Sequence, residues 1–237
     1  MIAKEQALLA KVLDVFAQKF DKQAVLRGGM VLRILGSPRF TNDLDYVFVP
    51  YRSKKDVLDE MLGCLRTIPG AKLEHSINSK CLRVFLTVGE TTVQIESKVA
   101  MSVKTTTAST RLLSTSFNLP PRLIHVVDLD VALANKMAAW NERRLVRDIY
   151  DIWFLLRMNA RPDEPTLRER LAKSAYSSRV KDKDAFPGKT CADFYEFLRE
   201  KVAKLDDRQI QDELADYLPP AETQGLGLLF KAALAKL

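Results

Sequence analysis

The chain has 237 residues, of which 47% are hydrophobic, so it holds enough apolar side chains for one large folded domain or two smaller ones, and disorder is not expected. No stretch approaches the roughly 18 apolar residues of a membrane helix, and the N-terminus carries charges at helical spacing instead of a signal peptide's apolar centre, so we expect a soluble, cytoplasmic protein. Three widely spaced cysteines and two histidines argue against a disulfide framework, a zinc site and a histidine-rich metal centre.

The net charge of +7 is concentrated in the first half of the chain. Residues 1–125 contain 18 Lys and Arg against 11 Asp and Glu, whereas residues 126–237 contain 19 of each kind and are neutral. A basic surface favours polyanions such as nucleic acids or nucleotides. A solvated lysine-rich face explains the same charge equally well.

Helices and strands are predicted to alternate in the first half of the chain. The expected elements are a helix over 2–20, a strand over 23–29 that ends in two glycines, a short helix over 30–36, a strand over 44–49, a helix over 54–68 and a hairpin over 80–100 with its turn at Gly89. A Ser/Thr-rich stretch over 102–121 is expected to be mostly loop with some extended structure.

Helical periodicity dominates the second half of the chain, interrupted by a polar stretch over 177–190 that is predicted to be a surface loop. We therefore expect an α/β (α+β) fold with two modules: residues 1–125 form a mixed sheet flanked by helices, and residues 126–237 are mainly helical. No repeat appears, and no heptad run demands assembly, so a monomer is expected.

One ordered set of residues points to chemistry on phosphates. Asp43 and Asp45 alternate along a strand, so their carboxylates point to the same side, at a spacing that suits one or two divalent cations. Glu96, on the second strand of the hairpin, is a candidate third carboxylate. Gly28 and Gly29 at a helix start allow backbone N–H groups to approach a triphosphate closely. Each feature alone is ordinary at a strand end or a turn, and only the ordered set indicates a site.

This order of a glycine pair, a short helix, Asp-x-Asp and a later acid resembles the DNA polymerase β-type nucleotidyltransferase superfamily. Residues 26–48, "LRGGMVLRILGSPRFTNDLDYVF", are most similar to the AbiEii/AbiGii toxin family within it, whose members carry Lys/Arg-Gly-Gly, an apolar helix and an "RFSxDLD"-like segment. Two departures stand out. Met30 occupies the place of a serine, which leaves Thr41 or Ser37 for a hydroxyl contact to phosphate, and Glu96 replaces the more usual aspartate.

A further family feature, a helix with Lys followed by Arg-Asp-x-x-Asp, is matched within residues 129–157. On one continuous helix, Lys136, Arg143 and Arg147 would lie within about 40° of one another and span about 16 Å, comparable to a triphosphate. Asp151 would then lie near Arg147 and orient it. The alternative is an amphipathic helix with a solvated basic stripe. Trp140 and Trp153 are predicted to be core residues, and His75 and His125 to be surface or strand residues.

The resemblance implies a nucleotidyltransferase-like fold and a metal-dependent enzyme that uses Mg²⁺ or Mn²⁺ to transfer NMP from an NTP, with release of pyrophosphate. It implies catalytic roles for Asp43, Asp45, Glu96, Lys136 and Asp148, metal ligation by Asp43, Asp45 and Glu96, and nucleotide binding by Gly28, Gly29, Arg39, Thr41, Lys136, Arg147 and Asp151.

The resemblance also implies a toxin of a bacterial toxin–antitoxin or phage-defence pair, with a cognate antitoxin encoded nearby and the 3′ end of a tRNA as acceptor. A basic first half is compatible with contacts to an RNA backbone. Two alternatives remain open at this point. The acceptor is a small molecule or a protein side chain, or the chain is a non-catalytic binding module on the same scaffold.

Overall fold

The computed structural model describes residues 2–174, 186 and 190–237; apart from Phe186 and Thr190, the stretch predicted as a surface loop lies outside them. The chain divides into two compact units, Met1–Asp128 and Leu129–Leu237. Within the described residues, every helix is too short or too polar to span a membrane.

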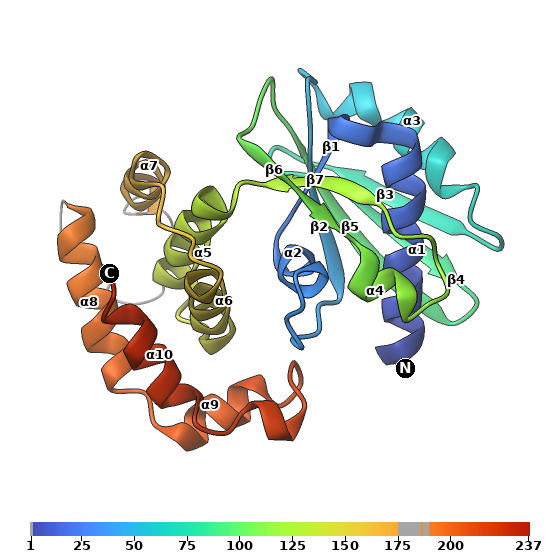
Figure 1. Cartoon of the computed structure of the whole chain (residues 1–237). Helices are drawn as coiled ribbons and strands as arrows, with labels where there is room; N and C mark the ends of the chain where they lie inside the picture. Colours follow the sequence, from blue (N-terminus) through green and yellow to red (C-terminus); the bar gives the residue numbers. More distant parts are fainter. Residues whose placement is uncertain (1, 175–185, 187–189) are drawn as a thin grey trace. The chain divides into compact units, whose positions relative to one another are not determined.

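The first unit is built on a seven-stranded mixed sheet in the order β3-β4-β5-β2-β1-β7-β6 (Figure 1). Its strands are β1 (Ala24–Arg27), β2 (Asp43–Phe48), β3 (Lys72–Ile77), β4 (Leu82–Val88), β5 (Thr91–Val99), β6 (Thr105–Ser109) and β7 (Leu123–Val127). Its helices are α1 (Ile2–Phe20), the 3₁₀ turn η1 (Asp21–Gln23), α2 (Gly29–Ile34), α3 (Lys54–Leu65) and α4 (Arg111–Thr115). Strand β2 runs parallel to β5, and β1 runs parallel to β7, while the other neighbours are antiparallel. The predicted mixed sheet flanked by helices is confirmed.

Helix α1 covers one face of this sheet and thereby decides where the acids of β2 point. The ring of Phe16 on α1 lies 5.1 Å from the ring of Tyr46 on β2, and α3 packs beside α1 and against β3, β4 and β5. Because side chains alternate along a strand, Asp43 and Asp45 point to the opposite face from Tyr46. The face that carries the acids is therefore the one that α1 leaves uncovered.

Most of the predicted elements of this unit are confirmed, including the β4–β5 hairpin, whose turn has Gly89 at φ 60°. Strand β3 was not predicted, because its side chains are almost all exposed and it lacks the apolar alternation that marks a half-buried strand. The Ser/Thr-rich stretch contains β6 and α4, and β7 continues to Val127, where helical structure was expected to begin.

The elements of the second unit are all helices within its described residues. Its elements are α5 (Leu129–Arg143), α6 (Val146–Arg157), α7 (Glu164–Ser174), α8 (Cys191–Ala203), α9 (Asp207–Leu214), the 3₁₀ turn η2 (Pro220–Glu222) and α10 (Leu226–Leu234). Trp140 and Trp153 are buried in its core, as predicted. The three cysteines of the chain are buried and free, which agrees with the absence of a disulfide framework.

The prediction of one continuous basic helix across residues 129–157 is wrong. The chain leaves α5 at Arg144, whose backbone is left-handed at φ 56°, and α6 begins after Leu145. Stacking stabilises this break, because the guanidinium carbon of Arg144 lies 4.3 Å from the ring centroid of Trp140 and 4.8 Å from that of Phe197. Arg147 consequently lies on a different helix from Lys136.

Candidate functional site

Gly28 connects β1 to α2 in a backbone conformation that suits glycine and few other residues. Its φ is 77° and its ψ is −155°, a combination that costs a residue with a side chain on the order of 1–3 kcal/mol. A Cβ atom at this position would lie 2.3 Å from Oδ2 of Asp45. The absence of a side chain at Gly28 is therefore what lets the Asp45 carboxylate occupy its place.

Gly29, the first residue of α2, is enclosed in a similar way by the loop that precedes β2. A Cβ atom on Gly29 would lie 2.6 Å from Nη2 of Arg39 and 3.0 Å from Oγ1 of Thr41. The glycine pair thus has a carboxylate on one side and a guanidinium and a hydroxyl on the other. The structure brings together five sequence-predicted site residues here, Gly28, Gly29, Arg39, Thr41 and Asp45.

The loop that carries Arg39 and Thr41 is held by one buried and one partly buried hydrogen bond. Oγ1 of Thr41 donates a hydrogen bond to Oδ1 of Asp43 at 2.9 Å, so it joins the second acid to the glycine pair. Nε2 of Gln6 on α1 donates to the main-chain oxygen of Thr41 at 2.7 Å. Both Arg39 and Thr41 are only 5% exposed, which limits the positions that their side chains can adopt.

The missing serine after the glycine pair has a structural explanation. Met30 is completely buried in the core of the first unit, so its side chain does not point towards a ligand. Of the two hydroxyls that were considered in its place, Ser37 is also completely buried, and its Oγ accepts a hydrogen bond from the backbone N–H of Arg39. Thr41 lies directly beside Gly29, which makes it the better placed of the two.

A row of four charged residues crosses the sheet on the face that carries Asp45. Strand register pairs Arg27 of β1 with Asp45 of β2, Asp45 with Glu96 of β5, and Glu96 with Arg83 of β4. Residues paired in register point to the same face, so Glu96 lies beside Asp45, on the strand that the sequence indicated. Along this row, two negative charges in the middle are flanked by one positive charge at each end.

The side chain of Glu96 is engaged by two neighbours. Nε of Arg83 donates to Oε1 of Glu96 at 3.0 Å, Nη2 of Arg83 donates to the same oxygen, and Nε2 of Gln94 donates to it at 3.1 Å. The hydrogen bond and the charge of Glu96 raise the pKa of the Arg83 guanidinium above its already high value. Within the described residues, every hydrogen bond of the Glu96 side chain ends on Oε1.

These acids fit a metal ion that is shared with a ligand and do not form an all-protein cage. Among the described residues, no group of three or more Asp, Glu, His or Cys side chains is arranged to hold a metal. Mg²⁺, however, is commonly bound by one or two carboxylates together with substrate phosphates and water. Asp43 and Asp45, on one face of β2, provide that pair of carboxylates.

In the second unit, two aspartates of α6 are buried against cations of α5. Asp151 is 1% exposed, and its Oδ2 lies 2.5 Å from Nζ of Lys136. Asp148 is also 1% exposed, and it accepts hydrogen bonds from Arg143 Nη2 at 2.6 Å and from Arg143 Nε at 3.1 Å. A bidentate pair of this kind orients both side chains.

Arg147 has a different partner from the one expected. Its Nη1 donates to the hydroxyl of Tyr217 at 3.1 Å, and its guanidinium carbon lies 5.4 Å from the Tyr217 ring. The expected orientation of Arg147 by Asp151 is wrong, because Asp151 binds Lys136. The three cations therefore do not form one uncompensated stripe, and each of them has a partner within the second unit.

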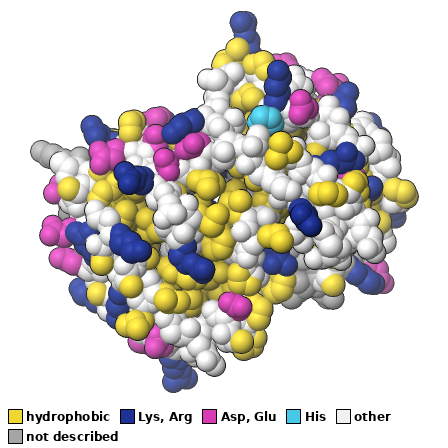
Figure 2. All heavy atoms as spheres, viewed as in Figure 1, with side chains coloured by type: hydrophobic (Ala, Val, Ile, Leu, Met, Phe, Trp, Pro, Cys, Tyr) yellow, Lys and Arg dark blue, Asp and Glu magenta, His cyan; other side chains and the backbone are white. Residues whose placement is uncertain are grey.

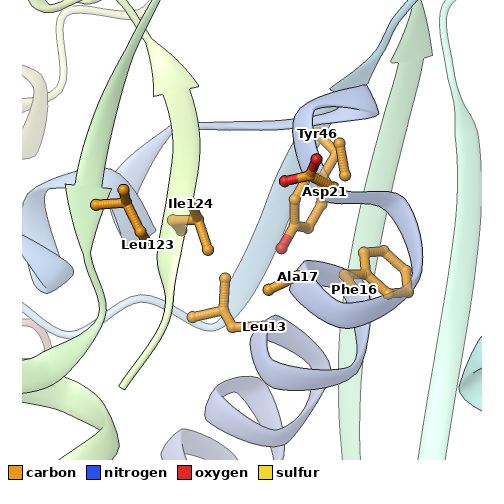
Figure 3. Close-up of a pocket in the computed structure, with 8 residues that line it drawn as sticks. Leu13, Phe16, Ala17, Asp21, Tyr46, Leu123 and Ile124 are labelled. Atoms are coloured by element: carbon orange, nitrogen blue, oxygen red, sulfur yellow. The ribbon is translucent and has the colours of Figure 1, made fainter. Parts of the chain in front are cut away.

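Figure 3 shows a small cavity of the first unit, whose lining includes none of the candidate site residues. It is lined by residues of α1, η1, β1, β2 and β7, among them Leu13, Tyr46 and Ile124. Its volume of about 10 Å³ has room for about one water molecule. Tyr46 points to the α1 side of the sheet, and its burial strongly raises the pKa of its hydroxyl. The cavity is too small for a nucleotide and lies on the wrong face for Asp45.

Three residues that contact the candidate site residues were not predicted from the sequence, namely Gln6, Arg83 and Tyr217. Arg83 could have been found, because the two-residue turn of the β4–β5 hairpin sets the register and places Arg83 opposite Glu96. Gln6 and Tyr217 gave no local signal, since their partners lie 35 and 70 residues away along the chain. The two histidines are strand residues, as predicted.

Comparison with known proteins identifies the family. The family model described as "Nucleotidyl transferase AbiEii toxin, Type IV TA system" matches residues 11–236, including the C-terminal helices for which the sequence offered no motif. Among solved structures, JHP933 from Helicobacter pylori has a TM-score of 0.56 at 14% identity, covering 98% of this chain and 91% of that one. MenT4, a nucleotidyltransferase toxin from Mycobacterium tuberculosis, has a TM-score of 0.53 at 18% identity, covering 100% of this chain and 84% of that one.

At these identities the two structures show a shared fold, and the family rests on the model that spans nearly the whole sequence. A search of curated proteins gave no match. The chain belongs to the AbiEii nucleotidyltransferase toxin family of toxin–antitoxin systems.

Proposed function

We propose that this nucleotidyltransferase transfers NMP from an NTP to the 3′ end of a tRNA in a metal-dependent reaction, and so blocks translation as a toxin that acts in phage defence. The observation that carries the proposal is the contact of the glycine pair with Asp45, Arg39 and Thr41. A nucleotidyltransferase toxin of a toxin–antitoxin system uses an NTP as donor and has an antitoxin as partner, and the antitoxin is expected from a neighbouring gene.

In this proposal the first unit binds the triphosphate. Backbone N–H groups of Gly28 and Gly29, at the start of α2, would contact phosphate oxygens. Asp43 and Asp45 would hold Mg²⁺ or Mn²⁺. The bound ion would neutralise negative charge on the triphosphate and on the pyrophosphate that leaves. Arg39 and Thr41, fixed beside Gly29, add a cation and a hydroxyl to the phosphate contacts.

Glu96 has a separate role in the proposal, on the acceptor. Its carboxylate lies beside Asp45 on the neighbouring strand, so it is placed to take the proton from the acceptor hydroxyl or to act as a further metal ligand. The proton would leave the hydroxyl as its oxygen attacks the α-phosphate, the new ester bond forms, and the bond to pyrophosphate breaks.

For the second unit, the family's Lys and Arg-Asp-x-x-Asp motif supports the assignment. Lys136 and Arg147 would neutralise the charge that develops on the phosphates. Asp151 and Asp148 are almost completely buried on α6, where Asp151 binds Lys136 and Asp148 binds Arg143, both on α5. We assign Asp148 and Asp151 to orienting these cations during nucleotide binding and transfer.

The charge distribution supports an RNA acceptor. The excess of positive charge lies in residues 1–125, which form nearly all of the first unit. Contacts to an RNA backbone are made largely by Lys and Arg and weaken with salt. On the face that Figure 2 shows, Lys and Arg side chains are interspersed with acidic ones, so the support for an RNA acceptor comes from the net charge of residues 1–125 and not from a patch on that face. A small molecule or a protein side chain is the second candidate acceptor.

A labelling experiment tests the acceptor and the metal together. The purified chain is incubated with each α-labelled NTP, Mg²⁺ and either total RNA or protein extract, with and without EDTA. We expect label in tRNA, abolished by EDTA and by Asp43→Ala, and retained in Asp59→Ala, whose exposed carboxylate lies on α3. Label found only in protein or only in a small molecule would refute the tRNA acceptor, and labelling unaffected by EDTA would refute the metal.

A further inference from the structure

We infer that Arg83 is a positioning residue for the nucleotidyl transfer, and that it acts by holding Glu96 through Oε1 so that Oε2 is presented to the acceptor hydroxyl or to the metal. The inference rests on the proposed function, because it assumes that Glu96 takes part in the reaction.

Strand register brings Arg83 and Glu96 together. The β4–β5 hairpin pairs Arg83 with Glu96, and the parallel β2–β5 pairing places Glu96 beside Asp45. Neighbouring strands lie about 4.8 Å apart, so Asp45 and Glu96 present two negative charges at close range. Like charges opposite each other destabilise a sheet. In the strand register, Arg83 lies on the far side of Glu96 and Arg27 on the far side of Asp45.

The hydrogen bonds show how Glu96 is oriented. Both donors of Arg83 and the amide of Gln94 converge on Oε1, so one carboxylate oxygen accepts three hydrogen bonds. The other oxygen, Oε2, accepts none from the described residues and remains available for a ligand. Hydrogen-bonding partners of a ligating or reacting carboxylate orient it, and their loss typically lowers metal affinity or activity.

A purely structural role for the pair has a weaker basis. The Arg83 side chain is 36% exposed and that of Glu96 28% exposed, and ion pairs at such exposure contribute little to folding stability. A residue that contributes little to stability and still converges on a site carboxylate is better explained by positioning. The two explanations differ in what the loss of Arg83 should change.

The test compares Arg83→Met, Arg83→Lys, Glu96→Gln and the double variant Arg83→Met/Glu96→Gln, in the full chain with labelled NTP, Mg²⁺ and total RNA. Thr87→Val is the matched control, since Thr87 makes a cross-strand side-chain hydrogen bond to Thr92 in the same hairpin. We expect Arg83→Met to lower kcat about 10- to 100-fold with the KM for NTP nearly unchanged, and Arg83→Lys to recover most of the loss.

Two further readouts separate positioning from other roles. In the Glu96→Gln background, Arg83→Met should cause no additional loss, because a residue that acts only through Glu96 has nothing left to position. The melting temperature of Arg83→Met, and its affinity for NTP in EDTA, should match those of Thr87→Val. A full additional loss in the double variant, a rise in kcat, or loss of metal-free NTP binding would each overturn the inference.

Failure of the inference can be told apart from failure of the proposed function. If Glu96→Gln is fully active while Asp43→Ala is inactive, Glu96 is not part of the reaction and the inference alone is refuted. If Asp43→Ala is also fully active, the proposed function itself is refuted.

Discussion

The carboxylate of Asp45 occupies the space that a side chain at Gly28 would need. A Cβ atom on Gly28 would lie 2.3 Å from Oδ2 of Asp45, closer than any real contact allows. The glycine between β1 and α2 and the acid on β2 are thus two parts of one packing arrangement, because the Asp45 carboxylate fits there only while residue 28 has no side chain.

Gly28→Ala should therefore lower activity far more than it lowers stability. The new Cβ must displace Asp45, and we expect NTP-dependent labelling to fall at least about 100-fold, with a stability loss of about 1–3 kcal/mol from the backbone conformation. Gly63→Ala is the control, because a Cβ on Gly63 in α3 would meet nothing within 4 Å. It should leave activity unchanged and stabilise the protein by about 0.5–1 kcal/mol in urea unfolding. Equal activity of the two variants would contradict the packing argument.

Thr41→Val should weaken the use of NTP, whereas Thr41→Ser should preserve it. The hydroxyl of Thr41 donates to Oδ1 of Asp43, and a hydrogen bond to a charged group contributes about 1.5–3 kcal/mol. Valine keeps the shape of threonine and removes this donor. We expect kcat/KM for NTP to fall by about 10- to 100-fold in the valine variant. If Thr41→Ser loses activity to the same extent, the hydroxyl is not what matters at this position.

Acid should destabilise the first unit in part through Asp14. Burial by itself raises the pKa of Asp14, but the hydrogen bond and charge of Arg122, whose Nε lies 2.8 Å away, outweigh burial and lower it. A carboxyl with a lowered folded-state pKa stabilises the protein above its unfolded pKa of 3.8, and this contribution is lost as the pH falls through the folded value.

Asp14→Asn should consequently reduce the free energy of unfolding at pH 7. As the pH falls below about 4, the free energies of unfolding of the variant and of the unsubstituted protein should become more similar. Urea unfolding at a series of pH values measures both. A stability loss that stays constant down to the lowest pH would show that Asp14 contributes by packing and not by its charge.

The buried pair in the second unit should matter for stability as well as for activity. Asp151→Asn leaves the ammonium of Lys136, which is 17% exposed, without its countercharge, and loss of one partner of a buried pair costs about 3–5 kcal/mol. Asp212→Asn breaks the exposed Arg208–Asp212 pair instead and should cost less than about 0.5 kcal/mol. Urea unfolding compares the two, and equal losses would contradict the distinction.

The helical and strand periodicities predicted most of the first unit, and strand alternation correctly placed Asp43 and Asp45 on one face. These features depend on neighbours within a few residues, which is why they can be derived from the sequence. Strand β3 escaped prediction for the opposite reason. It pairs with β4 through its backbone while its side chains remain exposed, so its sequence carries no pattern of burial.

The sequence by itself determined the order of the elements, the glycine pair, the Asp-x-Asp strand and the motifs that resemble the family. Only the tertiary structure decided which residues bind one another. The predicted continuous helix breaks at Arg144, because stacking of its guanidinium on the rings of Trp140 and Phe197 stabilises the left-handed backbone there, and local periodicity contains no information about that stacking. Arg147 consequently binds Tyr217, 70 residues away, and Glu96 binds Arg83. Such partners are chosen by the packing of segments distant in sequence, and this is the physical reason why they appear only in the folded chain.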